Sequence, residues 1–222
     1  MSTYLLINLL ILLFPLLLSF DKKTAYYKNM PRVFLSAIIV GTVFLVWDSI
    51  AVLRGDWSFN TDFIGDIYIF NLPLEEILFF ATVPYSCIFI YEVLRYYVTD
   101  KQLRIKNGTI FFFALIFIVS AFLFIDQYYT FTVLLFPAFF LLTALFNFNN
   151  LLRSKIYWLT ILLSYIPFLI VNFLLTSLPV VSYNDNAIWG YRFMTIPVED
   201  FFYSYSMISF WLLIYRVSRR FL

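Results

Sequence analysis

Two pairs of adjacent acidic residues begin apolar, aromatic-rich stretches of this 222-residue chain. Glu75 and Glu76 form the first pair, Glu199 and Asp200 form the second, and each pair follows a proline and one aliphatic residue. Carboxyl groups at the boundary of a bilayer are costly unless they have partners or a function. Two carboxyl groups in different surroundings can also divide the roles of general acid and general base. The two pairs are therefore the strongest candidates for catalytic residues.

A simpler interpretation is that both pairs only start helices at the membrane interface. Proline is favoured in the first turn of a helix, and acids there complement the helix dipole. However, the same order of residues occurs twice, and no basic residue stands nearby in the sequence to neutralise the acids. This repetition favours a functional role. Because neighbouring helical residues point about 100° apart, at most one acid of each pair is expected to face a given cavity.

Further candidates are polar and aromatic residues in the apolar stretches. Asp48 and Asn172 each interrupt an apolar run, where a polar side chain normally faces the interior of a helix bundle. An ionised Asp48 needs a partner or a proton there, so it is the less easily explained of the two as a structural residue. Asn172 is equally consistent with an interhelical hydrogen bond. The candidates for lining a cavity and shielding a cation are Trp47, Phe79, Asn172, Trp189 and Tyr203.

The residues that the chain lacks exclude several kinds of chemistry. It has no histidine and one cysteine, Cys87, which excludes an internal disulfide, a multi-cysteine metal site and His-based acid/base catalysis. No glycine-rich nucleotide fingerprint precedes a helix, so no site for a flavin or a nicotinamide is visible. The net charge of +2 does not indicate a nucleic-acid partner. We therefore predict proton chemistry by carboxyl groups, tyrosines or water, without a cofactor or a metal.

Composition places these residues in a membrane. The chain is 63% hydrophobic and 13% charged, with a mean hydropathy of +0.89, which is too apolar for an ordinary soluble domain. Seven apolar stretches are long enough, or nearly so, to cross about 30 Å of hydrocarbon as helices. The first is interpreted as a retained span rather than a signal peptide. The predicted spans are 4–20, 34–53, 74–97, 109–125, 130–147, 156–178 and 198–217.

The distribution of lysine and arginine predicts the orientation of these spans. Thirteen of the 15 basic residues fall in segments on one side of the membrane, and only Arg54 and Arg192 fall on the other. Basic residues are enriched in cytoplasmic segments. The N-terminus is therefore predicted outside and the C-terminus in the cytoplasm of an integral cell-membrane protein, with both acidic pairs near the outer surface. Glu92 is expected to form an interfacial ion pair with Arg95 at the cytoplasmic end.

The acidic pairs belong to an internal repeat. A shift of 124 residues superimposes the two prolines, the two acidic pairs, and Asp48 on Asn172. An offset of four spans preserves direction, so we predict two parallel three-helix repeats, residues 1–98 and 128–222, joined by a linker helix within residues 99–127. A pseudo-twofold axis along the membrane normal would bring the acidic pairs face to face. The predicted fold class is an all-α polytopic membrane protein with seven transmembrane helices.

Together, these motifs are similar to those of a known family. The residues concerned are Trp47-Asp48, Pro73-Leu74-Glu75-Glu76, Asn172 and Pro197-Val198-Glu199-Asp200. The chain resembles the membrane lycopene cyclases that occur as two small subunits or as one fused chain, over nearly its whole length. The resemblance implies that the linear ends of lycopene are cyclised to β-ionone rings without the flavin of the unrelated soluble-fold cyclases. The implied partners are the lipophilic carotenoid and membrane lipid, and a homo-oligomer is left open.

Such a cyclisation suits carboxyl chemistry because it involves no net redox change. An acid protonates C2 of the terminal alkene, the C5–C6 double bond attacks the resulting cation, and a base removes a proton from C6. We hypothesise that one acid of each pair takes each role and that Asp48 supports protonation. Changing Glu75 or Glu199 to glutamine is then expected to abolish ring formation.

Two other classes of function stay open on the sequence alone. One is a proton- or cation-coupled transporter in which the outer carboxylates form an ion site. The other is a non-catalytic membrane protein that binds a carotenoid or a lipid. Lycopene-producing cells that turn from red to orange would favour the cyclase, whereas retained pigment with an unchanged spectrum would favour the binding protein.

Overall fold

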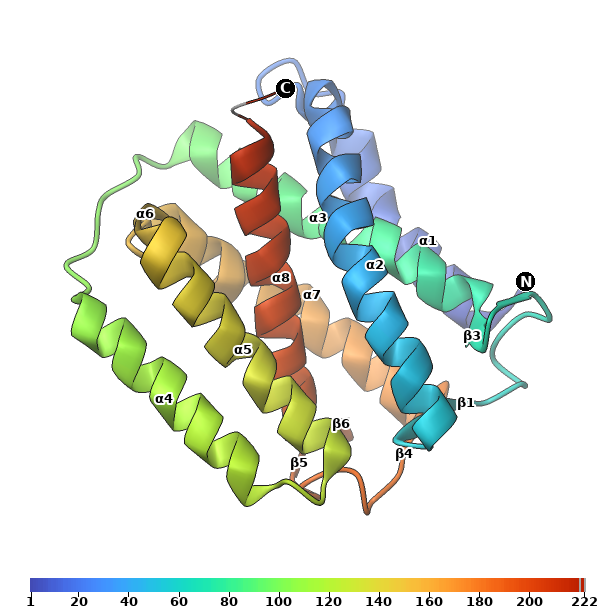
Figure 1. Cartoon of the computed structure of the whole chain (residues 1–222). Helices are drawn as coiled ribbons and strands as arrows, with labels where there is room; N and C mark the ends of the chain where they lie inside the picture. The colour runs from blue at the N-terminus through green and yellow to red at the C-terminus, as the bar shows by residue number, and fades with distance from the viewer. Residues whose placement is uncertain (220, 222) are drawn as a thin grey trace.

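The chain folds into a bundle of long helices, and the connections from α2 to α3 and from α7 to α8 are long and carry short strands (Figure 1). The computed structural model describes residues 1–219 and 221. Its long helices are α1 (Thr3–Leu18), α2 (Met30–Arg54), α3 (Leu74–Tyr97), α4 (Asn107–Leu123), α5 (Tyr128–Asn147), α7 (Lys155–Ser177) and α8 (Val198–Ser218). Two short helices, η1 (Tyr26–Asn29) and α6 (Asn149–Leu152), precede α2 and α7.

Among the described residues, four helical segments are long and apolar enough to cross a membrane: Tyr26–Arg54, which joins η1 and α2, together with α3, α5 and α7. Helices α1 and α4 are apolar but have only 16 and 17 residues. Helix α8 has 21 residues but starts with two acids and contains several serines. About half of its side chains are buried against other helices. A helix that contacts protein on most sides can contain more polar residues than a helix that faces lipid. The fold is that of a helical membrane protein, and the count of seven spans stays a prediction.

Helix α8 lies in the middle of the bundle, where it contacts α2, α3, α5 and α7 (Figure 1). Helix α3 also packs against α1, α2 and α7, whereas α4 lies at the edge of the bundle against α5. The core between these helices includes the fully buried side chains of Ile88, Phe140 and Trp211. Because lipid is as apolar as these side chains, close packing rather than removal from water holds them together.

Three short antiparallel ribbons lie at the end of the bundle that carries the acidic pairs. They are β1 (Trp57–Phe59) with β4 (Val181–Tyr183), β2 (Tyr68–Ile69) with β3 (Leu72–Pro73), and β5 (Arg192–Phe193) with β6 (Ile196–Pro197). The all-α prediction missed these ribbons because segments of two or three residues carry no periodic pattern.

The β2–β3 and β5–β6 hairpins turn in the same way. Phe70 and Met194 have φ angles of 56° and 57°, although neither is a glycine. Such a backbone costs on the order of 1 kcal/mol or more for a bulky residue, so the surrounding contacts must fix each turn. Each hairpin runs directly into a helix, β3 into α3 and β6 into α8. The hairpins therefore set the direction of the acidic pair that follows.

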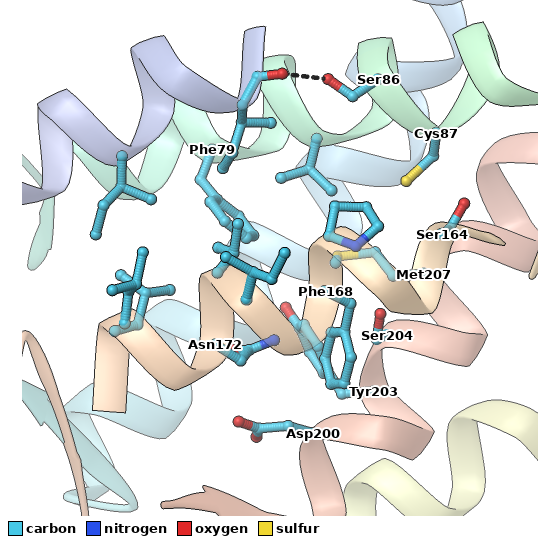
Figure 2. A pocket seen from close by; sticks show the side chains of 18 of the residues that line it. Phe79, Ser86, Cys87, Ser164, Phe168, Asn172, Asp200, Tyr203, Ser204 and Met207 are labelled. Atoms are coloured by element: carbon cyan, nitrogen blue, oxygen red, sulfur yellow. Dashed lines mark hydrogen bonds between the residues drawn. The ribbon is translucent and has the colours of Figure 1, made fainter. Parts of the chain in front are cut away.

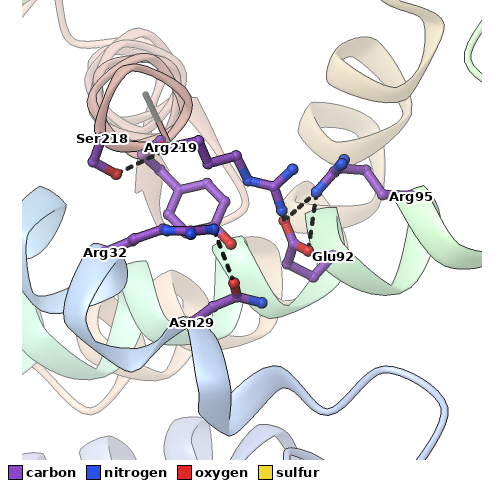
Figure 3. A network of polar contacts seen from close by, with 7 residues as sticks. Asn29, Arg32, Glu92, Arg95, Ser218 and Arg219 are labelled. Atoms are coloured by element: carbon purple, nitrogen blue, oxygen red, sulfur yellow. Dashed lines mark hydrogen bonds and ion pairs between the residues drawn. The ribbon is translucent and has the colours of Figure 1, made fainter. Parts of the chain in front are cut away.

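At the opposite end of the bundle, Glu92 of α3 binds two arginines (Figure 3). Its Oε1 accepts hydrogen bonds from Arg95 Nη1 at 3.0 Å and from Arg219 Nη2 at 2.7 Å. The first contact confirms the Glu92–Arg95 pair expected from the sequence. The second joins the C-terminal ends of α3 and α8, the two helices whose other ends carry the acids.

Candidate active site

The hairpins position the two acidic pairs through their final prolines. Pro73 and Pro197 are the N-cap residues of α3 and α8 and have extended backbones, with ψ angles of 150° and 141°. The sequence predicts proline within the first turn. The structure places it one position earlier, because the same residue also ends the β3 or β6 strand. The acids then occupy the first turn itself, where they complement the helix dipole as expected.

Glu75 holds the loop before α3 and does not line the neighbouring cavity. Its Oε1 accepts hydrogen bonds from the Gly65 backbone N–H at 2.8 Å and from the Ser2 hydroxyl at 2.5 Å. A Cβ atom at Gly65 would lie only 3.0 Å from this oxygen, so glycine permits the close approach. Glu75 Oε2 is buried without a hydrogen-bond partner among the described residues.

Glu199 makes the same pattern of contacts at the start of α8. Its Oε1 accepts hydrogen bonds from the Trp189 backbone N–H at 2.6 Å and from the Thr130 hydroxyl at 2.5 Å. Its Oε2 is also buried and has no partner in the part of the chain that the structure describes. Both glutamates thus tie a loop and the start of a neighbouring helix to the first turn of their own helix.

Glu76 and Asp48 face the cavity from α3 and α2. The Tyr4 hydroxyl donates to Glu76 Oε2 at 2.6 Å, and the Tyr203 hydroxyl donates to Asp48 Oδ1 at 3.0 Å. The two carboxyl groups are close enough to interact electrostatically. Among the described residues, neither forms an ion pair with a lysine or an arginine. Two neighbouring carboxyl groups without a cation favour a state in which at least one carries a proton.

Asp200 faces the same cavity from α8 but has different surroundings. The Tyr129 hydroxyl donates to its Oδ1 at 2.6 Å, and the Tyr183 hydroxyl donates to its Oδ2 at 2.9 Å. Burial and the Asp200 carboxyl raise the pKa of the Tyr183 hydroxyl well above its usual value, so this group stays a donor. The Arg192 guanidinium lies 5.9 Å from the centroid of the Tyr183 ring. Two hydroxyl donors and a nearby cation stabilise the ionised form of Asp200, whereas its burial favours the neutral form.

The three carboxyl groups lie at the hairpin end of an elongated cavity of about 550 Å³. Its walls come mainly from α1, α3, α7 and α8 and are largely apolar. Figure 2 shows this apolar wall, which includes Phe79, Phe168 and Met207, with Asp200 at its polar end. The cavity therefore suits a long apolar molecule that presents one end to the acids.

Most of the residues that the sequence predicts for the site lie in this cavity. The ones that line it are Asp48, Glu76, Phe79, Asn172, Asp200 and Tyr203. Trp47 packs behind the wall, with its ring centroid 5.5 Å from that of Tyr203. The Trp189 ring lies outside the cavity and meets the Tyr191 ring edge-to-face, with the ring centroids 4.7 Å apart. Its contact with the site is the hydrogen bond from its backbone N–H to Glu199. Glu75 and Glu199 are buried beside the cavity rather than in it.

The reasoning from sequence missed three of the tyrosines that bind the carboxyl groups. Tyr4, Tyr129 and Tyr183 line the cavity, and each donates a hydrogen bond to an acid. Among 17 tyrosines, composition alone does not single them out. The predicted repeat offers a usable signal, because Tyr4 and Tyr129 are 125 residues apart and bind acids that are 124 residues apart.

Fold and site together define a helical membrane protein with an apolar cavity that ends in carboxyl groups. A comparison with protein-family models matches residues 1–94 and 126–218 to the lycopene cyclase family. The chain therefore belongs to the lycopene cyclase family, and the resemblance seen in the acidic motifs is confirmed. Membership implies a carotenoid cyclase that acts on a lipophilic carotenoid. No curated protein and no solved structure matched the chain.

Proposed function

We propose that this protein is a lycopene β-cyclase, which converts the linear ends of lycopene to β-ionone rings in the membrane. The observation that carries the proposal is the joining of an apolar cavity to three carboxyl groups, Asp48, Glu76 and Asp200, each bound by at least one tyrosine hydroxyl. A polyene end fits the apolar part, and its cyclisation needs an acid and a base at the polar end.

The surroundings of the acids support a division of roles. Glu76 in its neutral form is the proton donor, and Asp48 beside it favours that form because two neighbouring carboxylates repel each other. Proton transfer to C2 of the terminal alkene leaves a tertiary cation at C1. The C5–C6 double bond attacks C1, which forms the ring bond and moves the cation to C5.

Asp200 is the base that completes the reaction. Its carboxylate takes the proton from C6, and the electrons of that C–H bond form the C5–C6 double bond of the β-ring. One proton enters and one leaves, so substrate and product are isomers. The rings of Phe79 and Tyr203 line the cavity. Between protonation and loss of the C6 proton, their π faces stabilise the cation and exclude water.

Glu75 and Glu199 have a positioning role in this proposal. Each fixes the loop before its helix through one backbone N–H, and so fixes the neighbouring acid that faces the cavity. This revises the expectation that glutamine in place of Glu75 or Glu199 abolishes ring formation. It agrees with the argument that adjacent helical residues cannot face one cavity together.

We further propose that the chain crosses the cell membrane seven times as two parallel repeats, with the N-terminus outside. The matched family segments flank α4, which supports α4 as a linker. Contacts that recur at a spacing of 124 residues also support the repeat, as with the bonds from Gly65 to Glu75 and from Trp189 to Glu199. Because α1 and α4 have only 16 and 17 residues, they cross the bilayer only where it is locally thinner.

The test is expression in a host that accumulates lycopene, followed by chromatography of the pigments. The wild type is expected to form β-rings, and Glu76→Gln and Asp200→Asn to form none. Asp62→Asn, at an exposed loop position, is the matched control and should behave as the wild type. Lycopene that is bound but unchanged in spectrum would instead identify a carotenoid-binding protein, and normal ring formation by both cavity variants would refute the assigned roles.

A further inference from the structure

The bundle contains two inter-helix gaps at equivalent positions of the proposed repeat, and only one of them is open. In the proposed repeat, α5 is equivalent to α1, because Tyr129 corresponds to Tyr4. Likewise α7 is equivalent to α2, because Asn172 corresponds to Asp48. The gap between α1 and α7 therefore corresponds to the gap between α5 and α2. Two equivalent gaps would allow two substrate ends to be held at once.

The gap between α1 and α7 opens from the cavity to the outer surface of the bundle. Leu10, Phe14 and Ile170 line the cavity, yet 53%, 68% and 59% of their surfaces are exposed on the outside. Side chains that belong to both surfaces mark the mouth of the cavity. In a membrane this mouth faces the acyl chains, from which a lipophilic substrate can enter without crossing water.

The equivalent gap between α2 and α5 is filled by aromatic rings. The ring centroid of Phe136 lies 5.0 Å from that of Phe44 and 5.1 Å from that of Trp47. Trp47 stands where the other half of the chain has Val171, and Phe136 stands where it has Ile11. Val171 and Ile11 line the open cavity. Two aliphatic residues in one half are thus exchanged for two large rings in the other.

The length of the open cavity also matches a single substrate end. On α1 it is lined from Tyr4 to Pro15, which at 1.5 Å per residue is about 17 Å. This is little more than half of the hydrocarbon thickness of about 30 Å. An extended forty-carbon polyene is about as long as this thickness, so a molecule that has one end at the acids must leave about half of its length outside the mouth, in lipid.

We infer that the protein takes its carotenoid end-on through the gap between α1 and α7 and cyclises one end in each binding event. Trp47 and Phe136 plug the equivalent gap, so the second end cannot reach an acid while the first is bound. A product with two rings requires release of the monocyclic carotenoid and its return in the opposite direction. This inference rests on the proposed cyclase function.

A time course with purified protein in liposomes tests the order of events. Labelled lycopene is supplied in excess, and unlabelled lycopene is added after the first turnovers. The monocyclic carotenoid is expected to accumulate first, free in the membrane, and the unlabelled chase should delay its conversion to the bicyclic product. Bicyclic product that forms from the first turnover, without a lag and unaffected by the chase, would overturn the inference while leaving the cyclase function intact. Absence of any ring would overturn both.

A pair of substitutions tests the position of the mouth. Ile170→Trp narrows it, whereas Ile166→Trp adds the same bulk on the same helix at a residue that is 58% exposed and does not line the cavity. We expect the initial rate of Ile170→Trp to fall by about tenfold or more, through a rise in apparent KM, and that of Ile166→Trp to stay within about twofold. Equal rates for the two variants, with equal yields of monodisperse protein, would place the entrance elsewhere.

Discussion

The adjacent residues Glu75 and Glu76 allow a sharp test of the roles assigned above, because one peptide bond separates a loop anchor from a proton donor. In Glu75→Gln the amide oxygen can still accept from Gly65 and Ser2, so only the charge is lost. A hydrogen bond to a charged group is worth about 1.5–3 kcal/mol and a neutral one about 0.5–1.5 kcal/mol. Two weakened bonds therefore predict a loss of about 2–3 kcal/mol in stability, with ring formation retained at a temperature where the protein is folded.

Glu76→Gln should show the opposite result. Its amide still accepts from the Tyr4 hydroxyl, which donates at 2.6 Å in the wild type, but it has no proton acidic enough for an alkene. Loss of a general acid typically costs about 10²–10⁴ in rate. Both variants should be measured for thermal unfolding in the same detergent and for initial rate in liposomes. An inactive Glu75→Gln protein with wild-type stability, beside an active Glu76→Gln protein, would refute the assignment.

Four further predictions concern other contacts. Tyr129→Phe removes one of the hydroxyl donors to Asp200 and should lower the rate by about tenfold, consistent with one lost hydrogen bond to a charged group, whereas Tyr128→Phe on the exposed neighbour should not. The pKa of Tyr183 is raised in the folded state, so the neutral hydroxyl stabilises the fold fully below its unfolded pKa of about 10. This stabilisation is lost as the pH rises through the folded pKa. Tyr183→Phe should therefore flatten the decline of the melting temperature above about pH 10. Glu92→Gln weakens the bonds to Arg95 and Arg219 and should lower the melting temperature by a few degrees without changing the product pattern. In a Cys87→Ala background, Asp62→Cys should react with an impermeant maleimide from outside the cell and Lys101→Cys only after permeabilisation; the reverse pattern would invert the proposed topology.

Much of the helical architecture could be predicted from the sequence, because long apolar runs carry their signal over many residues. The predicted span 156–178 and the observed α7, Lys155–Ser177, differ by one residue at each end. Helix α2 begins at Met30, four residues before the predicted span at 34, because Pro31 stabilises a first turn that apolarity alone does not reveal. Helix ends depend on such local contacts, whereas the existence of a span depends on composition.

The candidate site was harder to predict, because it depends on which way each side chain points. The sequence identifies both acidic pairs, but it does not say that Glu76 and Asp200 face the cavity while Glu75 and Glu199 face loops. That division follows from the hairpins β2–β3 and β5–β6, whose turns have unusual φ angles at ordinary residues. The three tyrosine donors that the sequence did not single out come from α1, α5 and β4, and only the tertiary fold brings them to the acids.

Contacts between equivalent residues support the proposed repeat and indicate how its two halves can share one site. In the β1–β4 ribbon Ser58 pairs with Ser182, and at the other end of the bundle the ring of Tyr91 lies 6.2 Å from that of Tyr215. Both pairs have a spacing of 124 residues. A residue that contacts its own equivalent lies close to a twofold axis, so these two contacts support a pseudo-twofold axis that runs from the acidic end of the bundle to the Glu92 end.

Near such an axis both halves of the chain line the same cavity. The residues that differ between the halves therefore determine the chemistry of each cavity wall. Asp48 has Asn172 as its equivalent, and Trp47 has Val171. Asp48 and Asn172 line the same cavity, so the exchange leaves one neutral wall and one acidic wall around the space that we propose for a single substrate end. An Asn172→Asp variant would restore equivalence and add a fourth carboxyl group. We expect it to fold less stably and to cyclise more slowly, because a further charge or proton must be accommodated in the same buried volume.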